Sequence, residues 1–388
     1  MSNSSNHPAN PGKSLLGSLL RACDVLEAFK TESEILRLRE VTSRTGLNKA
    51  TAFRILHTLT QRGLIQRVGE HGYRLAIRPL KRRKYRLGFA GQTTEYDFSR
   101  DVADSVARAA KQEGVELLVL DNRYNPKAAI HNADVFIWEK VDLVIEFQTF
   151  EHVAPIISTK FLEANIPIIA IDIPHPGATY FGADNYTAGL IGGRYLGRWA
   201  QRNWEGIVDQ IILLELPVAG ALPASRLTGT LVGLREILPE ISDSQVIHLN
   251  GNGQFQTSLE VMRKHFRQYR SGRLLISAIN DDSVLGALRA VEEVGRARDC
   301  AAMGQNGSYE ARQEMRRTGT RLVGSVGYFP ERYGDALIPL ALDILGKKPV
   351  PPAVFIKHQL IATEKVNHYY PNDQWLSRSN NSGISAQY

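Results

Sequence analysis

The chain of 388 residues is long enough for two or three domains, and its 43% apolar and 22% charged side chains are those of an ordinary globular protein. No run of about 18 apolar residues occurs, which argues against a membrane span. The net charge is uneven, because residues 1–86 carry 17 basic and 6 acidic side chains while the remainder is mildly acidic. Such a basic head indicates a polyanion-binding domain joined to something else.

Residues 1–14 are polar, contain Pro and Gly, and lack the basic-then-apolar order of an export signal. We therefore expect a disordered tail and a cytoplasmic protein. The two cysteines, Cys23 and Cys300, are far apart in the sequence. They are expected to be buried thiols in a reducing compartment.

Within the head, residues 15–80, a helix with one apolar face and one basic face is predicted over residues 48–63. The apolar positions recur at i, i+3, i+4 and i+7, the spacing of a buried helix face: Ala52, Ile55, Leu56 and Leu59. Asn48 is placed to cap its start and Gly63 its end. A shorter helix ends at Gly46, and an apolar stripe predicts another helix upstream: Leu19, Ala22, Cys23, Leu26 and Phe29. This is the order of a helix-turn-helix.

The stretch after the third helix alternates apolar and polar residues around Gly69–Gly72, which predicts a hairpin. Three helices followed by a hairpin make a winged helix, whose basic helix face can enter the major groove of DNA. Four residues form that face: Lys49, Thr51, Arg54 and His57. Arg67 and His71 lie in the hairpin, where they can reach phosphates or the minor groove. A winged helix used only for protein contacts is the alternative, and the charge excess favours DNA.

The segments "LLRACDVLEAF", "TGLNKATAFRILHTLTQRGLI" and "GYRLA" carry a resemblance to a known domain. Together they resemble the N-terminal domain of the IclR-type transcription regulators nearly end to end. The resemblance implies that Lys49, Thr51, Arg54 and His57 form the groove-facing set. Phe53 stands where a polar residue is usual in that family.

A basic linker over residues 81–86 leads into a body, residues 87–370, in which strands alternate with helices. Strands are predicted over residues 85–91, 115–121, 141–147, 166–172, 210–216, 244–250, 273–281 and 300–307. This alternation predicts parallel sheets with right-handed crossovers, and the long interval around residues 180–203 divides them into two runs. The fold class is therefore α/β, with two doubly wound lobes after the winged helix. Residues 371–388 are expected to be a second disordered tail.

Ligands of doubly wound sheets lie beyond the carboxyl ends of the strands, so two facing lobes predict a cleft. Polar residues that end apolar strands are the candidates for its walls: Asp172, Asn280, Asp281, Asp282, Gln305 and Asn306. No catalytic constellation is recognisable, since phosphate-loop, H-E-x-x-H, paired C-x-x-C and G-x-S-x-G motifs are missing. "GNGQFQ" at residues 251–256 lacks the third glycine of a dinucleotide fingerprint. We therefore expect neither an enzyme, nor a cofactor, nor a metal site.

Five segments of the body carry a second resemblance: "ANIPIIAID", "GADNYTAGLIGGRYL", "SRLTGTLVGLRE", "AINDDSVLGALRAVEEVG" and "GSVGYFPERYG". Residues 85–365 resemble the type I periplasmic sugar-binding proteins, in the ribose-binding branch shared with lactose-repressor-type regulators. The resemblance implies a pocket formed by Phe98, Asp172, Arg226, Phe255, Asp281 and Tyr328. The charged members can pair with sugar hydroxyls, and the aromatic ones can stack on ring faces. Gln148 follows the third strand, where that family often has asparagine, and Tyr328 stands where the ribose-binding proteins have an amide.

The sequence thus predicts a ligand-responsive transcription regulator. Its head would bind a double-stranded DNA operator as part of a homodimer, and its cleft would bind a small sugar or polyol. The alternative is the substrate-binding component of a sugar transporter, which would work outside the cytoplasm.

Overall fold

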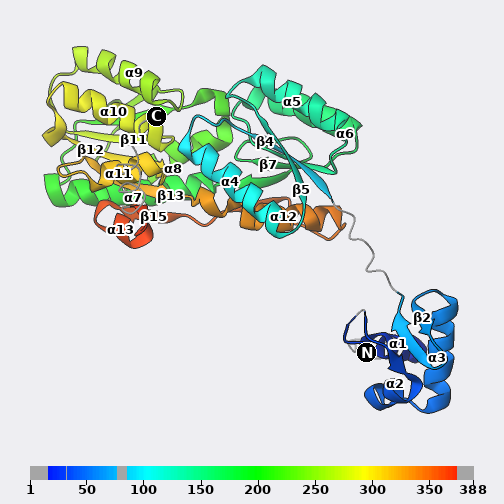
Figure 1. The fold of residues 1–388 in the computed structure, drawn as a ribbon. Coiled ribbons are helices and arrows are strands. Elements are labelled where there is room, and N and C mark those ends of the chain that lie inside the picture. The colour runs from blue at the N-terminus through cyan, green and yellow to red at the C-terminus, as the bar shows by residue number, and fades with distance from the viewer. Residues whose placement is uncertain (1–15, 32, 77–84, 374–388) are drawn as a thin grey trace, which may run out of the picture. The chain divides into compact units, whose positions relative to one another are not determined.

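The computed structural model describes residues 16–31, 33–76 and 85–373, and the chain divides into two compact units at residues 84 and 85 (Figure 1). The predicted tail over residues 1–14, most of the linker and residues 374–388 lie outside the described residues. No described helix is both long enough and apolar enough to cross a membrane.

The first unit is a winged helix, as predicted. Helices α1 (Gly17–Glu27), α2 (Leu38–Thr45) and α3 (Lys49–Gln61) pack on a small antiparallel sheet of order β1-β3-β2. Its strands are β1 (Leu36–Arg37), β2 (Ile65–Val68) and β3 (Gly72–Leu75). Gly46 adopts the left-handed conformation that ends α2 and lets the chain turn into α3. The core joins all three helices to the sheet through Val25, Val41, Leu56 and Ile65.

The apolar stripe predicted for α1 is only half buried. Phe29, just beyond the helix, is in the core, but Leu19 is 62% exposed and Cys23 is also exposed. Val25 and Ala28 are buried instead, so only the C-terminal part of α1 packs on the head. The prediction of two buried thiols is therefore wrong for Cys23 and correct for Cys300.

The second unit begins with a lobe built on six parallel strands in the order β14-β8-β7-β6-β4-β5. They are β4 (Arg86–Gly91), β5 (Glu116–Asp121), β6 (Leu143–Glu146), β7 (Ile168–Ile171), β8 (Thr179–Gly182) and β14 (Ala353–Phe355). Helices α4 (Asp97–Gln112) and α12 (Tyr333–Leu345) pack on one face of the sheet. Helices α5 (Pro126–Trp138) and α6 (Ala154–Glu163) pack on the other.

The second lobe has six strands in the order β10-β9-β11-β12-β13-β15, of which only β15 runs antiparallel. They are β9 (Gln210–Glu215), β10 (Val246–Asn250), β11 (Leu274–Ala278), β12 (Cys300–Asn306), β13 (Leu322–Gly327) and β15 (Gln359–Ala362). Helices α7 (Asn185–Trp204) and α8 (Ala221–Ile237) cover one face. Helices α9 (Phe255–Gln268), α10 (Asp281–Glu293) and α11 (Tyr309–Arg316) cover the other.

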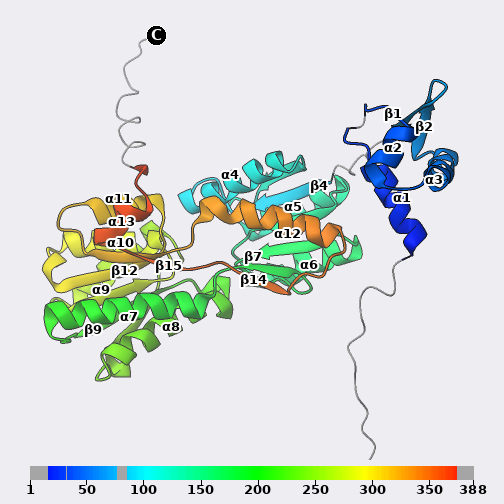
Figure 2. The same cartoon turned by 90° about the horizontal axis from the view of Figure 1, so that it is seen from below.

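Three segments connect the lobes, and we call them the hinge: residues 183–184, 328–332 and 356–358 (Figure 2). Two of them touch, because the backbone N–H of Asp184 donates a hydrogen bond of 3.0 Å to Nε2 of His358. The Tyr328 ring lies 4.9 Å from the His358 ring, which ties in the third segment.

The chain after β15 stays on lobe two and forms α13 (Val366–Tyr369). Asp373 is buried and pairs with Arg312 at 2.6 Å and with Arg316 at 3.0 Å. Asp373, which the sequence assigned to the tail, therefore packs against α11.

Candidate functional site

The basic face of the head is carried by α3. Asn48 begins this helix by accepting a hydrogen bond of 2.8 Å from the Thr51 N–H. Ala52, Leu56 and Leu59 are buried, as the spacing predicted. On the opposite side Lys49, Arg54 and His57 are exposed and Thr51 is half-buried. The helix thus presents its cationic and hydrogen-bonding side chains to solvent.

Phe53 adds an apolar element to that exposed surface. Its side chain is 48% exposed, and its ring lies 6.3 Å from the ring of His57 one turn later. A methyl group of thymine is the kind of base edge that such a ring can contact.

The wing presents the other two predicted DNA-binding residues. Arg67 is exposed on β2 and donates a hydrogen bond of 3.0 Å to the Glu70 carbonyl, which holds its guanidinium at the hairpin turn. His71 is exposed at the turn itself, 3.7 Å from the Glu70 carboxylate. The Arg67 guanidinium and the His71 imidazole therefore both lie at the tip of the hairpin.

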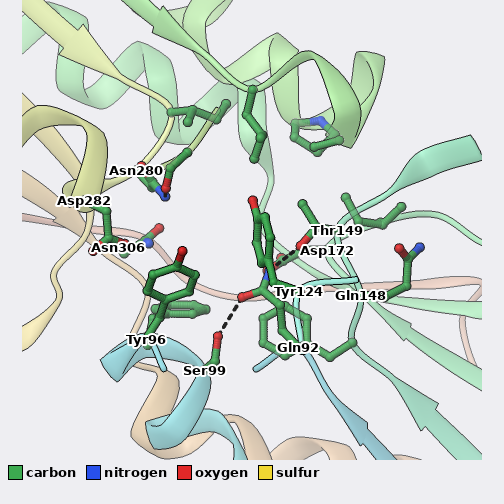
Figure 3. A pocket seen from close by; sticks show the side chains of 18 of the residues that line it. Gln92, Tyr96, Ser99, Tyr124, Gln148, Thr149, Asp172, Asn280, Asp282 and Asn306 are labelled. Carbon is green, nitrogen blue, oxygen red and sulfur yellow. Dashed lines mark hydrogen bonds between the residues drawn. The ribbon is translucent and has the colours of Figure 1, made fainter. Parts of the chain in front are cut away.

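The body contains a cleft between its lobes, with an empty volume of about 690 Å³ that includes space open to solvent (Figure 3). Its lobe-one wall follows the carboxyl ends of the strands: Gln92, Tyr96, Phe98, Ser99, Tyr124, Phe147, Gln148, Thr149, Asp172 and Ile173. The lobe-two wall does the same: Leu216, Ala219, Pro223, Arg226, Gly253, Ile279, Asn280, Asp282 and Asn306. This is the position expected for the ligand of two facing doubly wound sheets.

A chain of hydrogen bonds lines the lobe-one wall. The Ser99 hydroxyl donates to Gln92 Oε1 at 2.6 Å, and Gln92 Nε2 donates to the Thr149 hydroxyl at 2.7 Å (Figure 3). These bonds fix the amide and both hydroxyls in orientation. A preorganised row of neutral donors and acceptors is suited to reading the hydroxyl groups of a ligand.

Asp172 and Arg226 bring opposite charges to the cleft. Burial raises the pKa of the Asp172 carboxyl, and the nearby Arg226 guanidinium partly offsets this. Asp172 Oδ1 also accepts the Ala183 N–H at 3.3 Å. Arg226 donates to Asn185 Oδ1 at 2.7 Å and to the Ile279 carbonyl, so its guanidinium is held rigidly by the start of α7 and the end of β11.

The lobe-two wall is supplied by the start of α10. Asn280 caps this helix by accepting the Ser283 N–H at 3.1 Å, and its amide donates to the Gly253 carbonyl at 2.8 Å. Asp282 lies beside it on the wall, and burial raises the pKa of its carboxyl to about 6. Asn306, at the end of β12, contributes a further amide.

Of the six residues expected in the pocket, Phe98, Asp172 and Arg226 lie on the cleft wall and three do not. Asp281 is fully buried behind the wall, where it accepts bonds of 2.7 Å from the Ser308 N–H and the Ser325 hydroxyl. Tyr328 is buried beneath Arg226, 4.9 Å from its guanidinium, and donates to Gln305 Oε1 at 2.9 Å. Phe255 is 41% exposed and lines a separate surface groove on lobe two.

The sequence reasoning missed several wall residues: Gln92, Tyr96, Ser99, Tyr124 and Thr149. Gln92 directly follows the apolar strand β4, and Thr149 comes soon after β6. The rule of inspecting polar residues at strand ends would therefore have found both. Tyr124 also comes soon after its strand, β5, whereas Tyr96 lies further along the loop after β4.

Among the described residues, no group of three or more His, Cys, Asp and Glu side chains is arranged to hold a metal ion. The polar groups of the cleft are amides, hydroxyls, two carboxylates and one guanidinium, interleaved with aromatic rings. That mixture is suited to binding a small polar molecule with apolar patches.

Fold and site together define a two-lobed ligand-binding protein that carries a winged helix at its N-terminal side. Residues 18–69 match the IclR helix-turn-helix domain, and residues 87–349 match the periplasmic binding protein domain. The chain therefore belongs to the periplasmic binding protein domain family, joined to an IclR-type head.

Comparison with characterised proteins agrees with this assignment. The chain is 23% identical over 226 residues to the galactofuranose-binding protein YtfQ of Escherichia coli, covering 54% of this chain and 66% of that protein. It is 22% identical over 256 residues to the ribose import binding protein RbsB of Salmonella typhimurium, covering 65% of this chain and 82% of that protein.

Solved structures show the same fold. A periplasmic solute-binding protein from Actinobacillus succinogenes with bound D-allose matches at a TM-score of 0.64 and 19% identity, over 74% of this chain and all of that one. A protein from Mycobacterium smegmatis in complex with β-D-fucofuranose matches at 0.64 and 20% identity, over 78% of this chain and all of that one. Likenesses at this identity establish the architecture of the body.

Proposed function

We propose that this protein is a transcription regulator that binds operator DNA through its winged helix and senses a small carbohydrate or polyol in its interlobe cleft. It works in the cytoplasm, where its DNA is. The observation that carries the proposal is the pairing, in one chain, of an exposed basic α3 with a cleft whose walls carry oriented hydroxyls, amides and carboxylates.

The DNA-binding half of the proposal is supported by charge and geometry. Arg54 can form a bidentate contact with guanine, and Lys49 can neutralise a phosphate. The basic excess of residues 1–86 supplies the non-specific attraction that such contacts require.

The ligand half is supported by the chemistry of the walls. The Ser99–Gln92–Thr149 chain offers fixed hydrogen-bonding groups, and Tyr96 and Phe98 offer ring faces. Similar proteins have been solved with D-allose, myo-inositol or allitol bound, all of them neutral and rich in hydroxyls. A ligand of this class suits the cleft because its hydroxyls can satisfy both carboxylates and amides.

Ligand and DNA affinities are expected to be linked. Arg226 lies on the cleft wall. Its guanidinium lies over the ring of Tyr328 in the hinge and donates a hydrogen bond to Asn185 at the start of α7. Closure around a ligand that contacts Arg226 would therefore act on the hinge, and the resulting coupling to DNA binding would be reciprocal.

The experiment has two arms. A thermal-shift screen of D-allose, L-arabinose, D-ribose, myo-inositol and allitol tests the cleft, and selection from random duplex DNA at about 50 mM salt tests the head. Recovery of an enriched duplex sequence together with a stabilising sugar is the expected result. If no duplex is enriched in the presence or absence of these compounds, the regulator assignment is wrong.

A second function is favoured by the names of the relatives. The ribose import binding protein and several of the solved structures belong to transporters, so a transporter's substrate-binding component is the competing assignment. It would explain the cleft but not the basic face of α3. Binding of a sugar without any affinity for DNA would select it.

We also propose that two copies associate through α1. The exposed apolar residues of this helix recur at i, i+3, i+4 and i+7: Leu16, Leu19, Leu20 and Cys23. Residues 1–14 are polar and offer almost no apolar side chains to cover this stripe. The same stripe on a second copy is complementary to it, and a two-fold axis through the pair would present two α3 helices to an operator.

A further inference from the structure

The loop between β10 and α9 carries the "GNGQ" motif, residues 251–254, which the sequence left without a role. It faces the cleft, because Gly253 is part of the wall. Two tyrosines of lobe one, Tyr96 and Tyr124, lie on the opposite wall (Figure 3). We call residues 251–254 the GNGQ loop.

Both tyrosines contact this loop across the gap between the lobes. The Tyr124 hydroxyl donates a hydrogen bond of 3.5 Å to the Asn252 carbonyl. Burial raises the pKa of the Tyr96 hydroxyl, and the nearby Gln254 side chain partly offsets this. These are contacts between side chains of lobe one and a loop of lobe two, so they can exist only while the lobes are close together.

The rings of the two tyrosines form one unit on the lobe-one side. Tyr96 and Tyr124 meet edge to face with centroids 5.7 Å apart, and Tyr124 meets Phe150 in the same way at 5.6 Å. The hydroxyl of Tyr124 is therefore aimed by packing. Phe150 belongs to the segment after β6 and secures the pair to lobe one.

The backbone on both sides is in the left-handed region, which non-glycine residues seldom occupy. Arg123 and Tyr124 have φ of 53° and 49°, and Asn252 and Gly253 have φ of 51° and 67°. An aromatic residue is rarely found in this conformation, since its Cβ crowds the backbone. Such backbone strain persists at functional positions where the surrounding contacts hold it in place.

The GNGQ loop is also bound to a residue of the cleft. Asn280, on the lobe-two wall, donates a hydrogen bond of 2.8 Å to the Gly253 carbonyl. A ligand that engages Asn280 would therefore share a partner with the loop that the tyrosines hold. Asn280 would therefore connect a bound ligand directly to the GNGQ loop.

We propose that Tyr96 and Tyr124 are positioning residues that form a latch: they bind the GNGQ loop, stabilise the closed arrangement of the lobes and so control how long a ligand stays enclosed. The proposal rests on the proposed role of the cleft in ligand capture. It predicts that removing the Tyr124 hydroxyl opens the lobes without disturbing the fold of either.

The test measures closure directly and needs no ligand. In the full chain, Cys23→Ser removes the exposed thiol, while Cys300 is buried and inert. Lys127→Cys on α5 and Lys264→Cys on α9, both exposed in the parent, then accept a donor and an acceptor dye. Single-molecule energy transfer reports the ratio of closed to open molecules.

In this labelled parent, Tyr124→Phe is expected to lower that ratio about twofold, because an O–H···O contact of 3.5 Å is at the weak end of hydrogen bonds. Tyr124→Asn, which tolerates the left-handed backbone but lacks the ring, should lower it further. Gln254→Ala removes a partner from the other lobe and should act in the same direction. Tyr186→Phe, at an exposed tyrosine of α7, is the matched control and should leave the ratio unchanged.

Identical ratios in the parent, Tyr124→Phe and Tyr124→Asn would overturn the latch, provided that circular dichroism shows all three folded. This result is separable from failure of the proposed function. If D-allose or another screened sugar binds and the ratios are identical, only the latch is wrong. A Tyr124-dependent ratio in a protein that binds neither sugar nor DNA would leave the latch standing and remove the regulator assignment.

Discussion

The carboxylate of Asp281 accepts a hydrogen bond of 2.7 Å from the hydroxyl of Ser325, which joins the start of α10 to the middle of β13. Its second oxygen accepts the Ser308 N–H at the same distance. The site is so tight that a Cβ on Gly304 would lie 2.1 Å from Asp281 Oδ1. Asp281 therefore fastens three neighbouring elements of lobe two, and the adjacent Asp282 is the residue on the cleft wall.

Because Asp281 joins elements of lobe two and Asp282 lines the cleft, substitutions of these two residues should have different effects. Asp281→Ala leaves two buried donors without an acceptor, which should lower the free energy of unfolding by about 1–3 kcal/mol for each. Asp282→Asn should leave stability near the parent value and weaken sugar binding, by about 1.5–3 kcal/mol if the carboxylate accepts a ligand hydroxyl. Denaturant titration and calorimetry with a sugar found in the screen measure these effects.

Asp281→Asn is the control, since its amide oxygen can still accept one of the two bonds. The assignment is wrong if Asp282→Asn binds sugar as the parent does while a well-folded Asp281→Ala does not.

The same two residues show what the sequence could predict of the site. The pattern from Asn280 to Asp282 correctly marked a strand that ends at the cleft. Which of three consecutive polar side chains faces the ligand depends on the residue at which α10 starts, because successive helical positions point about 100° apart. Asn280 caps the helix, so Asp281 turns into the lobe and Asp282 toward the cleft. The sequence did not show at which residue α10 starts, so it did not show that Asp282 and not Asp281 faces the cleft.

The strands show a similar limit. Every strand predicted in the body is present, and most of them lie within apolar runs between turn residues. Four strands were not predicted: β8, β13, β14 and β15. β13, "LVGSVG", is buried throughout and rich in small residues, so it shows neither alternation nor bulk. β14 has three residues and β8 and β15 have four, and none of them lies within a longer apolar run like those that marked the equally short β6 and β7.

The packing of α7 on α8 leads to a second prediction. A Cβ on Gly193 would lie 2.0 Å from the Thr230 carbonyl oxygen, and one on Gly189 would lie 1.8 Å from that of Arg226. These are backbone atoms that cannot rotate away. Gly193→Ala should therefore force the helices apart, lower the free energy of unfolding by about 3 kcal/mol and displace Arg226 from the cleft.

The matched control is Gly192→Ala at the preceding position of α7. There the nearest atom to the new Cβ is Nε2 of Gln305 at 3.2 Å, the end of a side chain. Gly192→Ala should therefore lower the free energy of unfolding clearly less than Gly193→Ala. Equal losses in the two variants would show that close helix contact is not what Gly193 provides.

Glu146 predicts a pH dependence of stability. It is fully buried at the end of β6, where one oxygen accepts the Asn122 amide at 2.8 Å and the other has no partner among the described residues. Burial raises the pKa of its carboxyl from 4.5 to about 8. Between these values the folded state holds a proton that the unfolded state has lost, so stability falls as pH rises, by up to about 1.4 kcal/mol per unit.

Glu146→Gln should abolish this contribution. The measurement is the free energy of unfolding of the parent and of Glu146→Gln at each pH from 5 to 8. The difference between the two proteins isolates the contribution of Glu146. This subtraction is needed because burial raises the pKa of Asp281 to about 7, so Asp281 contributes in the same pH range. Trp138, Trp199 and Trp204 lie in the body and residues 1–84 contain no tryptophan, so tryptophan fluorescence does not report on the head. A difference that does not vary with pH would mean that Glu146 is ionised in the folded protein.

On the head, Arg54→Ala tests the reading face of α3. Arg54 is exposed, so its loss should leave the melting temperature unchanged. Operator affinity should fall by about 1–3 kcal/mol, with selectivity lost at one base pair, if the guanidinium reads a guanine. Arg298→Ala removes the same charge from an exposed site on lobe two and should have little effect. Unaltered selectivity in Arg54→Ala would remove this residue from the reading face.

The exposed stripe of α1 predicts a contact that the chain's own thiol can report. If Leu16, Leu19 and Leu20 of two copies pack together, the two Cys23 side chains come within reach of a short bismaleimide, while the buried Cys300 does not react. The parent should give a cross-linked dimer, and Cys23→Ser should give none. Leu20→Asp places a charge in the stripe and should lower cross-linking to the Cys23→Ser level and weaken operator binding, because two linked heads gain affinity from simultaneous contact. Cross-linking that survives in Leu20→Asp would place the association of the two copies elsewhere on the molecule.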